Sequence, residues 1–142
     1  MANLEKFYIP QYDKAGIYVV INKTKMKAYV GQSVNIKRRA IQHKTGIQRR
    51  NHSVKEINKD SDDEFTFLVL HKFYGENIPK NKLDFYEKMY MFTLASAGFE
   101  LYNKNEVGYY KSVLDIAAYI CSDVAFEIGT EENLKDAYFE KY

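Results

Sequence analysis

The chain has 142 residues, of which 46% are hydrophobic and 28% are charged, and its formal net charge is +2. This size and composition predict one domain with its own core, and the charged share argues against a membrane protein. The single cysteine, Cys121, excludes an internal disulfide and a cysteine-rich zinc site. The start of the chain is too polar for a signal peptide, and the most apolar stretch, 113–126, is interrupted by two aspartates. We therefore expect a soluble, cytoplasmic protein.

Charge is distributed unevenly along the chain. Residues 14–59 contain twelve lysines and arginines but one acidic residue, whereas residues 112–142 contain seven acidic residues and two lysines. A strongly basic half favours a polyanionic partner, because neutralised phosphates release their counterions. A lysine-rich face that is simply solvated has the same composition, so charge alone leaves both interpretations open.

The first half of the chain predicts a β-hairpin followed by helices. Residues 16–22 are mostly β-branched or aromatic, and 28–31 resume the apolar pattern after a polar turn, which is typical of two paired strands. Ser33 or Asn35 is predicted to cap a helix that runs to about Lys44 and stops at Thr45-Gly46. A second, short helix is predicted over 52–59, before the acidic turn at 60–63.

The second half predicts one more strand and further helices. Residues 65–71 cluster apolar side chains as a strand does, and 80–97 has helical spacing with Gly98 as its stop. In that helix Tyr86, Tyr90 and Leu94 are predicted to pack in the core. Further helices are predicted from Ser112 to about Phe126, with Cys121 as a small buried residue, and from Thr130.

The order of elements is β-β-α-α-β-α, followed by an acidic helical tail. It predicts an α+β fold in which helices flank a small, three-stranded antiparallel sheet. The predicted domain boundaries are 1–104 for this core and 105–142 for a C-terminal helical extension packed on or beside it.

Two tripeptides occupy the predicted hairpin, Gly16-Ile17-Tyr18 on one strand and Tyr29-Val30-Gly31 on the other. Tyrosines on adjacent strands can project toward the same face of a sheet. The pair resembles the signature of the GIY-YIG nuclease family, with valine at the centre of the second half. The resemblance extends over roughly residues 14–104.

The resemblance implies a set of catalytic residues. The family's catalytic arginine stands eight residues beyond the second glycine, which is Arg39 here, and a histidine or tyrosine stands four residues later, which is His43. The stretch 84–90 resembles the helix that carries the family's metal-binding glutamate, at Glu87. Tyr18 and Tyr29 complete the implied catalytic set. The closing asparagine of the family falls on Asn103, and His52 matches a histidine found in some members.

Together these residues suit phosphodiester hydrolysis. Glu87 would hold a Mg²⁺ or Mn²⁺ ion, and Arg39 would stabilise charge on the phosphate. The resemblance makes Tyr18 the general base, with Tyr29 orienting the phosphate or water. A free phenol has a pKa of about 10, so we expect Arg39, or a proton-accepting His43, to lower the pKa of Tyr18.

The expected partner is DNA, and double-stranded DNA in particular. Besides the catalytic set, the residues predicted to contact it are Gly31, Lys37, Arg38, Arg49, Arg50, His52 and Asn103. The loop at Arg49-Arg50 is expected to set substrate preference. One active site nicks one strand, so cutting both would require a homodimer or sequential action.

Two other functions remain open at this stage. The domain could bind nucleic acid without cleaving it, or it could bind a protein partner through the acidic tail while the basic half is merely solvated. For each residue alone, a structural role is the simpler interpretation; only their joint spacing favours an endonuclease.

Overall fold

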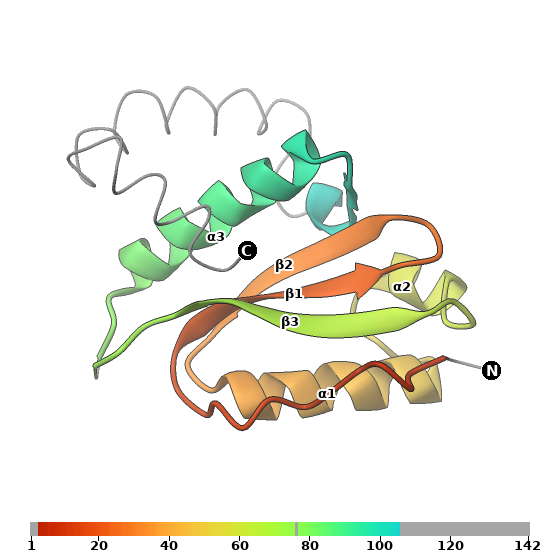
Figure 1. Ribbon diagram of the computed structural model, residues 1–142, viewed down its shortest axis with the longest axis horizontal. Coiled ribbons are helices and arrows are strands. Elements are labelled where there is room, and N and C mark those ends of the chain that lie inside the picture. The colour runs from red at the N-terminus through yellow and green to blue at the C-terminus, as the bar shows by residue number, and fades with distance from the viewer. Residues whose placement is uncertain (1–2, 76, 106–142) are drawn as a thin grey trace.

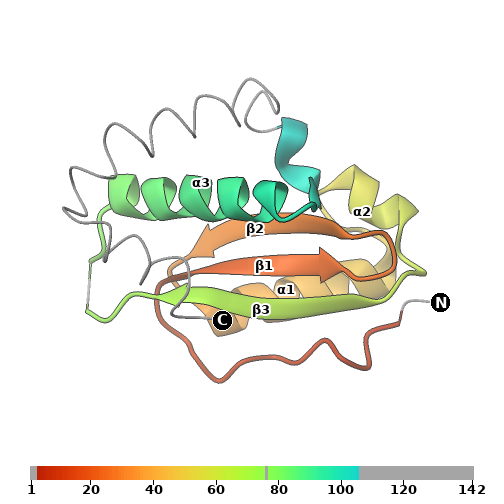
Figure 2. The same ribbon diagram turned by 45° about the horizontal axis from the view of Figure 1, so that its top comes forward.

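The computed structural model describes residues 3–75 and 77–105, which form a small sheet with helices on both faces (Figures 1 and 2). The elements in chain order are β1 (Gly16–Asn22), β2 (Lys27–Ser33), α1 (Ile36–Arg49), α2 (Lys55–Lys59), β3 (Phe65–Lys72), α3 (Lys80–Ser96), β4 (Glu100–Leu101) and the 3-10 helix η1 (Tyr102–Asn105). The helices predicted after Ser112, Cys121 and nearly all of the C-terminal extension lie outside the described residues. In the part of the chain that is described, no helix is long and apolar enough to cross a membrane.

The sheet has four strands in the order β3-β1-β2-β4. β1 pairs antiparallel with both β2 and β3, and β4 pairs parallel with β2. The α+β class is therefore confirmed, but the prediction of three antiparallel strands is wrong. The additional strand has two residues, too few for a periodic pattern to indicate it.

β1 is buried on both faces because a helical layer covers each side (Figure 1). Ile17 and Val19 face α3 and belong to one apolar core. Tyr18 and Val20 face the opposite way, into a second core that includes side chains of α1 and α2. In α3, Tyr90 and Leu94 are buried as predicted, while Tyr86 packs against the core half-buried.

Helix α1 begins as predicted and ends later. The Asn35 side chain caps it by accepting a hydrogen bond from the backbone N–H of Arg38. The predicted stop at Thr45-Gly46 is wrong, because the helix continues to Arg49 and ends at Arg50 in the left-handed conformation, φ 56°. Gly46 lies inside the helix, where an added Cβ would meet His52 side-chain atoms at 3.2 Å. This glycine thus permits close packing instead of ending the helix.

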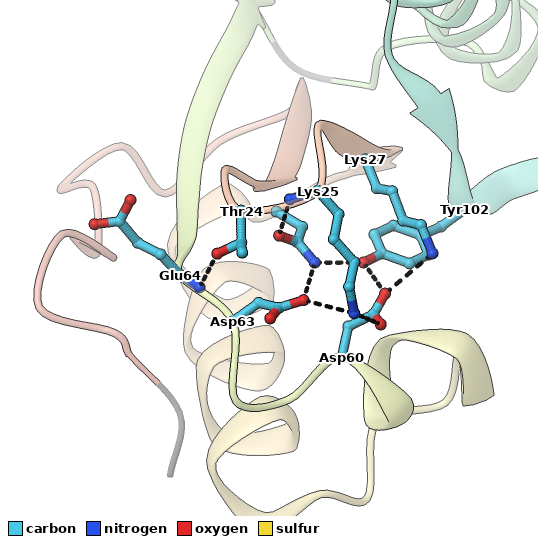
Figure 3. Close-up of polar contacts among 8 residues, drawn as sticks. Thr24, Lys25, Lys27, Asp60, Asp63, Glu64 and Tyr102 are labelled. Atoms are coloured by element: carbon cyan, nitrogen blue, oxygen red, sulfur yellow. Dashed lines mark hydrogen bonds and ion pairs between the residues drawn. The ribbon is translucent and has the colours of Figure 1, made fainter.

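A polar network fastens the β1–β2 turn to the loop before β3 and to η1 (Figure 3). Asp60, 6% exposed, accepts hydrogen bonds from the Tyr102 hydroxyl at 2.7 Å and from Lys25 Nζ at 2.6 Å. Asn22, fully buried, donates to Asp63 at 2.9 Å and to the Tyr102 hydroxyl at 3.1 Å. Each buried polar group is thereby satisfied, so the turn of the hairpin is held in one position.

Asn103 continues the edge of β2 where β4 ends. Its side-chain amide donates to the carbonyl oxygen of Val30 at 2.7 Å and accepts from the Val30 N–H at 3.0 Å. The side chain is 1% exposed. It therefore supports the sheet between Tyr29 and Gly31, whereas the sequence-based prediction placed it in contact with DNA.

Replacing Asn103 with alanine is expected to lower the free energy of unfolding by about 2–4 kcal/mol, because both polar groups of Val30 lose their buried partner. Urea unfolding followed by circular dichroism measures the change. Asn81→Ala, at an exposed position of α3, is the matched control and should shift stability by less than about 0.5 kcal/mol. Equal stabilities for the two variants would contradict a structural role for Asn103.

Candidate active site

The hairpin places Tyr18 and Tyr29 on the α1 face of the sheet, with ring centroids 6.5 Å apart. Tyr18 pairs directly with Gly31 across the two strands. A Cβ added at Gly31 would lie 2.3 Å from the Tyr18 hydroxyl oxygen. Gly31 therefore makes room for the tyrosine ring, a contact that only glycine allows in this register. Gly31 is buried beside Tyr18 and also lines the cavity described below, so its predicted contact with DNA stays a prediction.

A chain of short hydrogen bonds leads from Tyr18 through two histidines. The Tyr18 hydroxyl lies 2.7 Å from His43 Nε2, and His43 Nδ1 lies 2.6 Å from His52 Nε2. His52 Nδ1 accepts a hydrogen bond from the backbone N–H of Val54 at 3.0 Å. Both imidazoles are buried, at 2% and 7% exposure. His52, predicted to contact DNA, thus orients His43.

The backbone bond at Val54 fixes the direction of this chain. An amide N–H can only donate, so His52 Nδ1 is an acceptor and a neutral His52 carries its proton on Nε2. His52 then donates to His43 Nδ1, and His43 donates from Nε2 to the Tyr18 oxygen. In this arrangement His43 cannot take up the proton of Tyr18, contrary to the sequence-based expectation.

Burial keeps both histidines neutral. Desolvation, aided by the charges of His52 and Arg39, lowers the pKa of His43 to about 2. Desolvation and the charge of Arg39 lower the pKa of His52 to about 4. The pKa of Tyr18 is raised, chiefly by burial and then by Tyr29, while Arg39 acts in the lowering direction. The expectation of a lowered Tyr18 pKa does not hold: Arg39 lowers it by less than burial raises it.

One cavity of about 580 Å³ collects the remaining predicted catalytic groups. Tyr18 and Tyr29 reach it from the hairpin, Arg39 from α1 and Glu87 from α3. The Arg39 guanidinium is oriented by a hydrogen bond to Gln42 Oε1 at 2.9 Å. A phenol, a guanidinium and a carboxylate therefore line one hollow with a polar and basic mouth, which suits a phosphate group.

The residues around Glu87 fit a divalent ion bound mainly by its substrate. Among residues 3–75 and 77–105, no group of three or more histidine, cysteine, aspartate or glutamate side chains could hold a metal ion. Mg²⁺ does not need one, because it commonly uses one or two carboxylates together with waters and phosphate oxygens. Glu87 lines the cavity alongside one further carboxylate, Asp84, one helical turn earlier.

The predicted DNA-contacting cations differ in their surroundings. Arg38 is exposed and lines the cavity. The preceding residue, Lys37, is half-buried and does not line the cavity. Arg49 is exposed at the end of α1. Arg50 is exposed and pairs with Asp62 at 2.6 Å, so part of its charge is already balanced.

Sequence reasoning did not single out four residues near the site. Gln42 orients Arg39, and its spacing of three residues on one helix could have indicated this. Gln32 donates to Asp84 Oδ1 at 2.6 Å, and Lys80 Nζ donates to both Gln32 and Asp84. These three line the cavity between β2 and α3. The Lys80–Asp84 pair has i,i+4 spacing on α3, whereas the contacts of Gln32 are long-range and no local spacing indicates them.

The fold and this constellation agree with a comparison to protein families. The model of the GIY-YIG catalytic domain matches residues 14–111, more than half of the chain, so the protein belongs to this family. Membership supports a nuclease-type function in general. Comparisons with curated proteins and with solved structures each found no match.

The neutral histidines predict a loss of stability in mild acid. Histidine in the unfolded chain has a pKa of about 6.5. Below that pH the unfolded chain therefore binds protons at His43 and His52, whereas in the folded protein both side chains stay neutral. Their contribution is complete above pH 6.5 and is lost as the pH falls toward about 4, at up to about 1.4 kcal/mol per pH unit for each group.

Urea unfolding between pH 7 and pH 5 measures this slope. His43→Gln should lower the slope of stability against pH by close to the contribution of one proton, about 1.4 kcal/mol per pH unit, since glutamine does not titrate. Gln48→Ala, which alters an exposed side chain of α1 that does not titrate, should leave the slope unchanged. A wild-type slope equal to that of His43→Gln would contradict the neutral state of His43.

Proposed function

We propose that this protein is a divalent-metal-dependent endonuclease that hydrolyses phosphodiester bonds in double-stranded DNA. The observation that carries the proposal is the shared cavity, where Tyr18, Arg39 and Glu87 arrive from three different elements. Family membership supports the nuclease class, and the excess of basic residues over 14–59 supports a polyanionic substrate.

Arg39 binds and orients the scissile phosphate. The residue is half-buried at the wall of the cavity and its guanidinium is held by Gln42, so little side-chain freedom is lost when it donates to phosphate oxygens. Its charge also lies close enough to Tyr18 to act on the pKa of the phenol. Arg39 thus stabilises negative charge both on the phosphate and on a deprotonated Tyr18.

Tyr18 acts as the general base in its phenolate form. The His43 Nε2–H already donates to the Tyr18 oxygen, so this bond becomes charge-assisted when the phenol loses its proton. The phenolate then takes a proton from a water whose oxygen attacks phosphorus. The bond between phosphorus and the 3′-oxygen breaks, and the 3′-oxygen leaves as an alkoxide that takes a proton from solvent water. His43 remains neutral throughout, and its contribution is to hold the Tyr18 oxygen in place.

Glu87 would hold the metal ion, Mg²⁺ or Mn²⁺, at the wall opposite α1. When bound, the ion would supply positive charge against the phosphate and the departing oxygen. Glu87 is carried by α3, whose apolar face packs on the sheet, so its backbone has a fixed position relative to the hairpin. Its negative charge raises the pKa of Tyr18, which couples the two groups electrostatically.

Glu87→Gln is expected to abolish plasmid nicking in the presence of Mg²⁺, because the neutral amide is a poor ligand for a hard cation. Gel electrophoresis of supercoiled plasmid measures the nicked fraction over time. The control Glu5→Gln, at an exposed glutamate of the N-terminal segment, should nick at the wild-type rate. Equal rates for wild type and Glu87→Gln would exclude Glu87 as the ligand.

The rate of cleavage by the wild type is expected to rise about tenfold per pH unit between about pH 6.5 and 9. The raised pKa of Tyr18 lies above this window, so the fraction of phenolate, and with it the rate, increases with pH throughout. Tyr18→Phe should lower kcat by roughly 10²- to 10⁴-fold with little change in DNA affinity.

Single-turnover rates across this pH range, together with filter binding of DNA, test the role of Tyr18. Tyr86→Phe, which alters a half-buried tyrosine of the core, should keep the wild-type profile. A loss in Tyr18→Phe that is confined to binding would reduce Tyr18 to a positioning role.

A second candidate function is a nucleic-acid-binding module without activity, which the basic region favours. Salt-sensitive binding of DNA by a wild type that does not nick would establish it. The alternative of a protein partner bound through the acidic tail concerns residues outside the described part of the chain. Cleavage of both strands, if observed, would call for a second copy of the chain or sequential nicking.

A further inference from the structure

A second cavity, of about 440 Å³, adjoins the proposed reaction cavity on the other side of Arg39. Arg39, Gln42 and His43 line it, together with residues from the end of α1 and from the loop 51–53. Arg39 and Gln42 line both cavities, so these two side chains stand where the hollows meet. A polymer that contacts Arg39 in one cavity could therefore extend into the other.

The lining of this second cavity combines apolar surface, which includes Ile41, with polar side chains, and it carries no acidic side chain among the described residues. Thr45, Asn51 and Ser53 offer hydroxyl and amide groups, which both donate and accept hydrogen bonds. Arg39 supplies a positive charge at one end. Neutral amides and hydroxyls can form hydrogen bonds with the edge of a base, and one nearby cation can pair with one phosphate. Both features suit a nucleotide within a strand.

The dimensions also suit a nucleotide. Thr45 follows Arg39 by six residues of α1, which corresponds to about 9 Å along the helix axis. Successive bases of one DNA strand rise by about 3.4 Å, so a strand whose phosphate lies at Arg39 places its next one or two nucleotides along this hollow. His43 and His52 also line the cavity. Their ring nitrogens already form the hydrogen bonds that lead from Val54 to Tyr18.

We infer that this cavity is a subsite for the nucleotide that flanks the scissile phosphate on the cleaved strand, with the Asn51 amide as its main contact. The inference rests on the proposed function, because it takes the phosphate at Arg39 to be the one that is cut. It adds a specificity-determining surface that the charged residues at 49–50 do not supply. Asn51 is exposed, so replacing its side chain leaves the core untouched.

The test is a double-mutant cycle between Asn51 and single nucleotides of the substrate. Sites of cleavage are first mapped with the active wild-type protein and Mg²⁺. Binding is then measured by fluorescence anisotropy in the Glu87→Gln background, with a duplex that contains a mapped site and one abasic residue placed at successive positions of the cleaved strand.

Asn51→Ala is expected to weaken binding of the intact duplex roughly tenfold, the size of one good base contact. This loss should shrink to less than about twofold when the abasic residue occupies one position within two nucleotides of the cut. Thr45→Val should behave in the same way with a smaller effect. Gln48→Ala, an exposed amide on α1 that lines neither cavity, should bind every duplex as the parent does.

The outcomes separate the two proposals. Cleavage by the wild type without coupling between Asn51 and any flanking position would overturn the subsite and leave the nuclease function standing. Absence of cleavage would overturn the function, and the subsite with it. Equal losses on all duplexes, abasic or intact, would make Asn51 a backbone contact and would also refute the subsite.

Discussion

The hydrogen bond between the Tyr18 hydroxyl and His43 Nε2 joins the sheet to α1 inside a buried layer, and the site depends on it. Which of the two groups donates is decided at His52. The Val54 N–H donates to His52 Nδ1, and this bond fixes the tautomers of both His52 and His43. Burial disfavours a positive charge on either histidine, so both stay neutral. His43 therefore offers Tyr18 a hydrogen-bond donor and no acceptor. The same burial raises the pKa of the phenol. Burial thus disfavours the Tyr18 phenolate, and the charge and hydrogen bond of Arg39 offset only part of that cost.

Several residues of the family pattern support the framework of the site. Gly31 leaves space for the Tyr18 ring, and Asn103 completes the edge of β2 through both polar groups of Val30. The network around Asp60 and Tyr102 holds the far end of the same hairpin. These contacts converge on one short hairpin, and that hairpin carries both tyrosines of the cavity. A rigid support of this kind is what precise placement of a catalytic phenol requires.

Much of the fold could be predicted from local patterns. The three longer strands, the cap of α1 at Asn35 and the core positions Tyr90 and Leu94 follow from side-chain type and spacing, which act over a few residues. β4 could not be predicted, since two residues carry no period and its partner lies some seventy residues earlier in the chain. The end of α1 was misjudged for a related reason. Gly46 has the composition of a helix stop, but its lack of a side chain serves the packing of His52.

By itself, the sequence determined which chemical groups this protein has and on which elements they stand: two tyrosines on a hairpin, Arg39 and His43 one turn apart, and Glu87 on a separate helix. Those assignments rest on short-range periodicity. Only the tertiary structure decided their states and partners, because burial and hydrogen bonding depend on residues distant in sequence. It decided that Gly31 and Asn103 are buried, that Arg50 is paired with Asp62, and that His43 donates to Tyr18. It also decided that Arg39 stands between two hollows, a property of packing between α1 and its neighbours that no spacing along the chain contains.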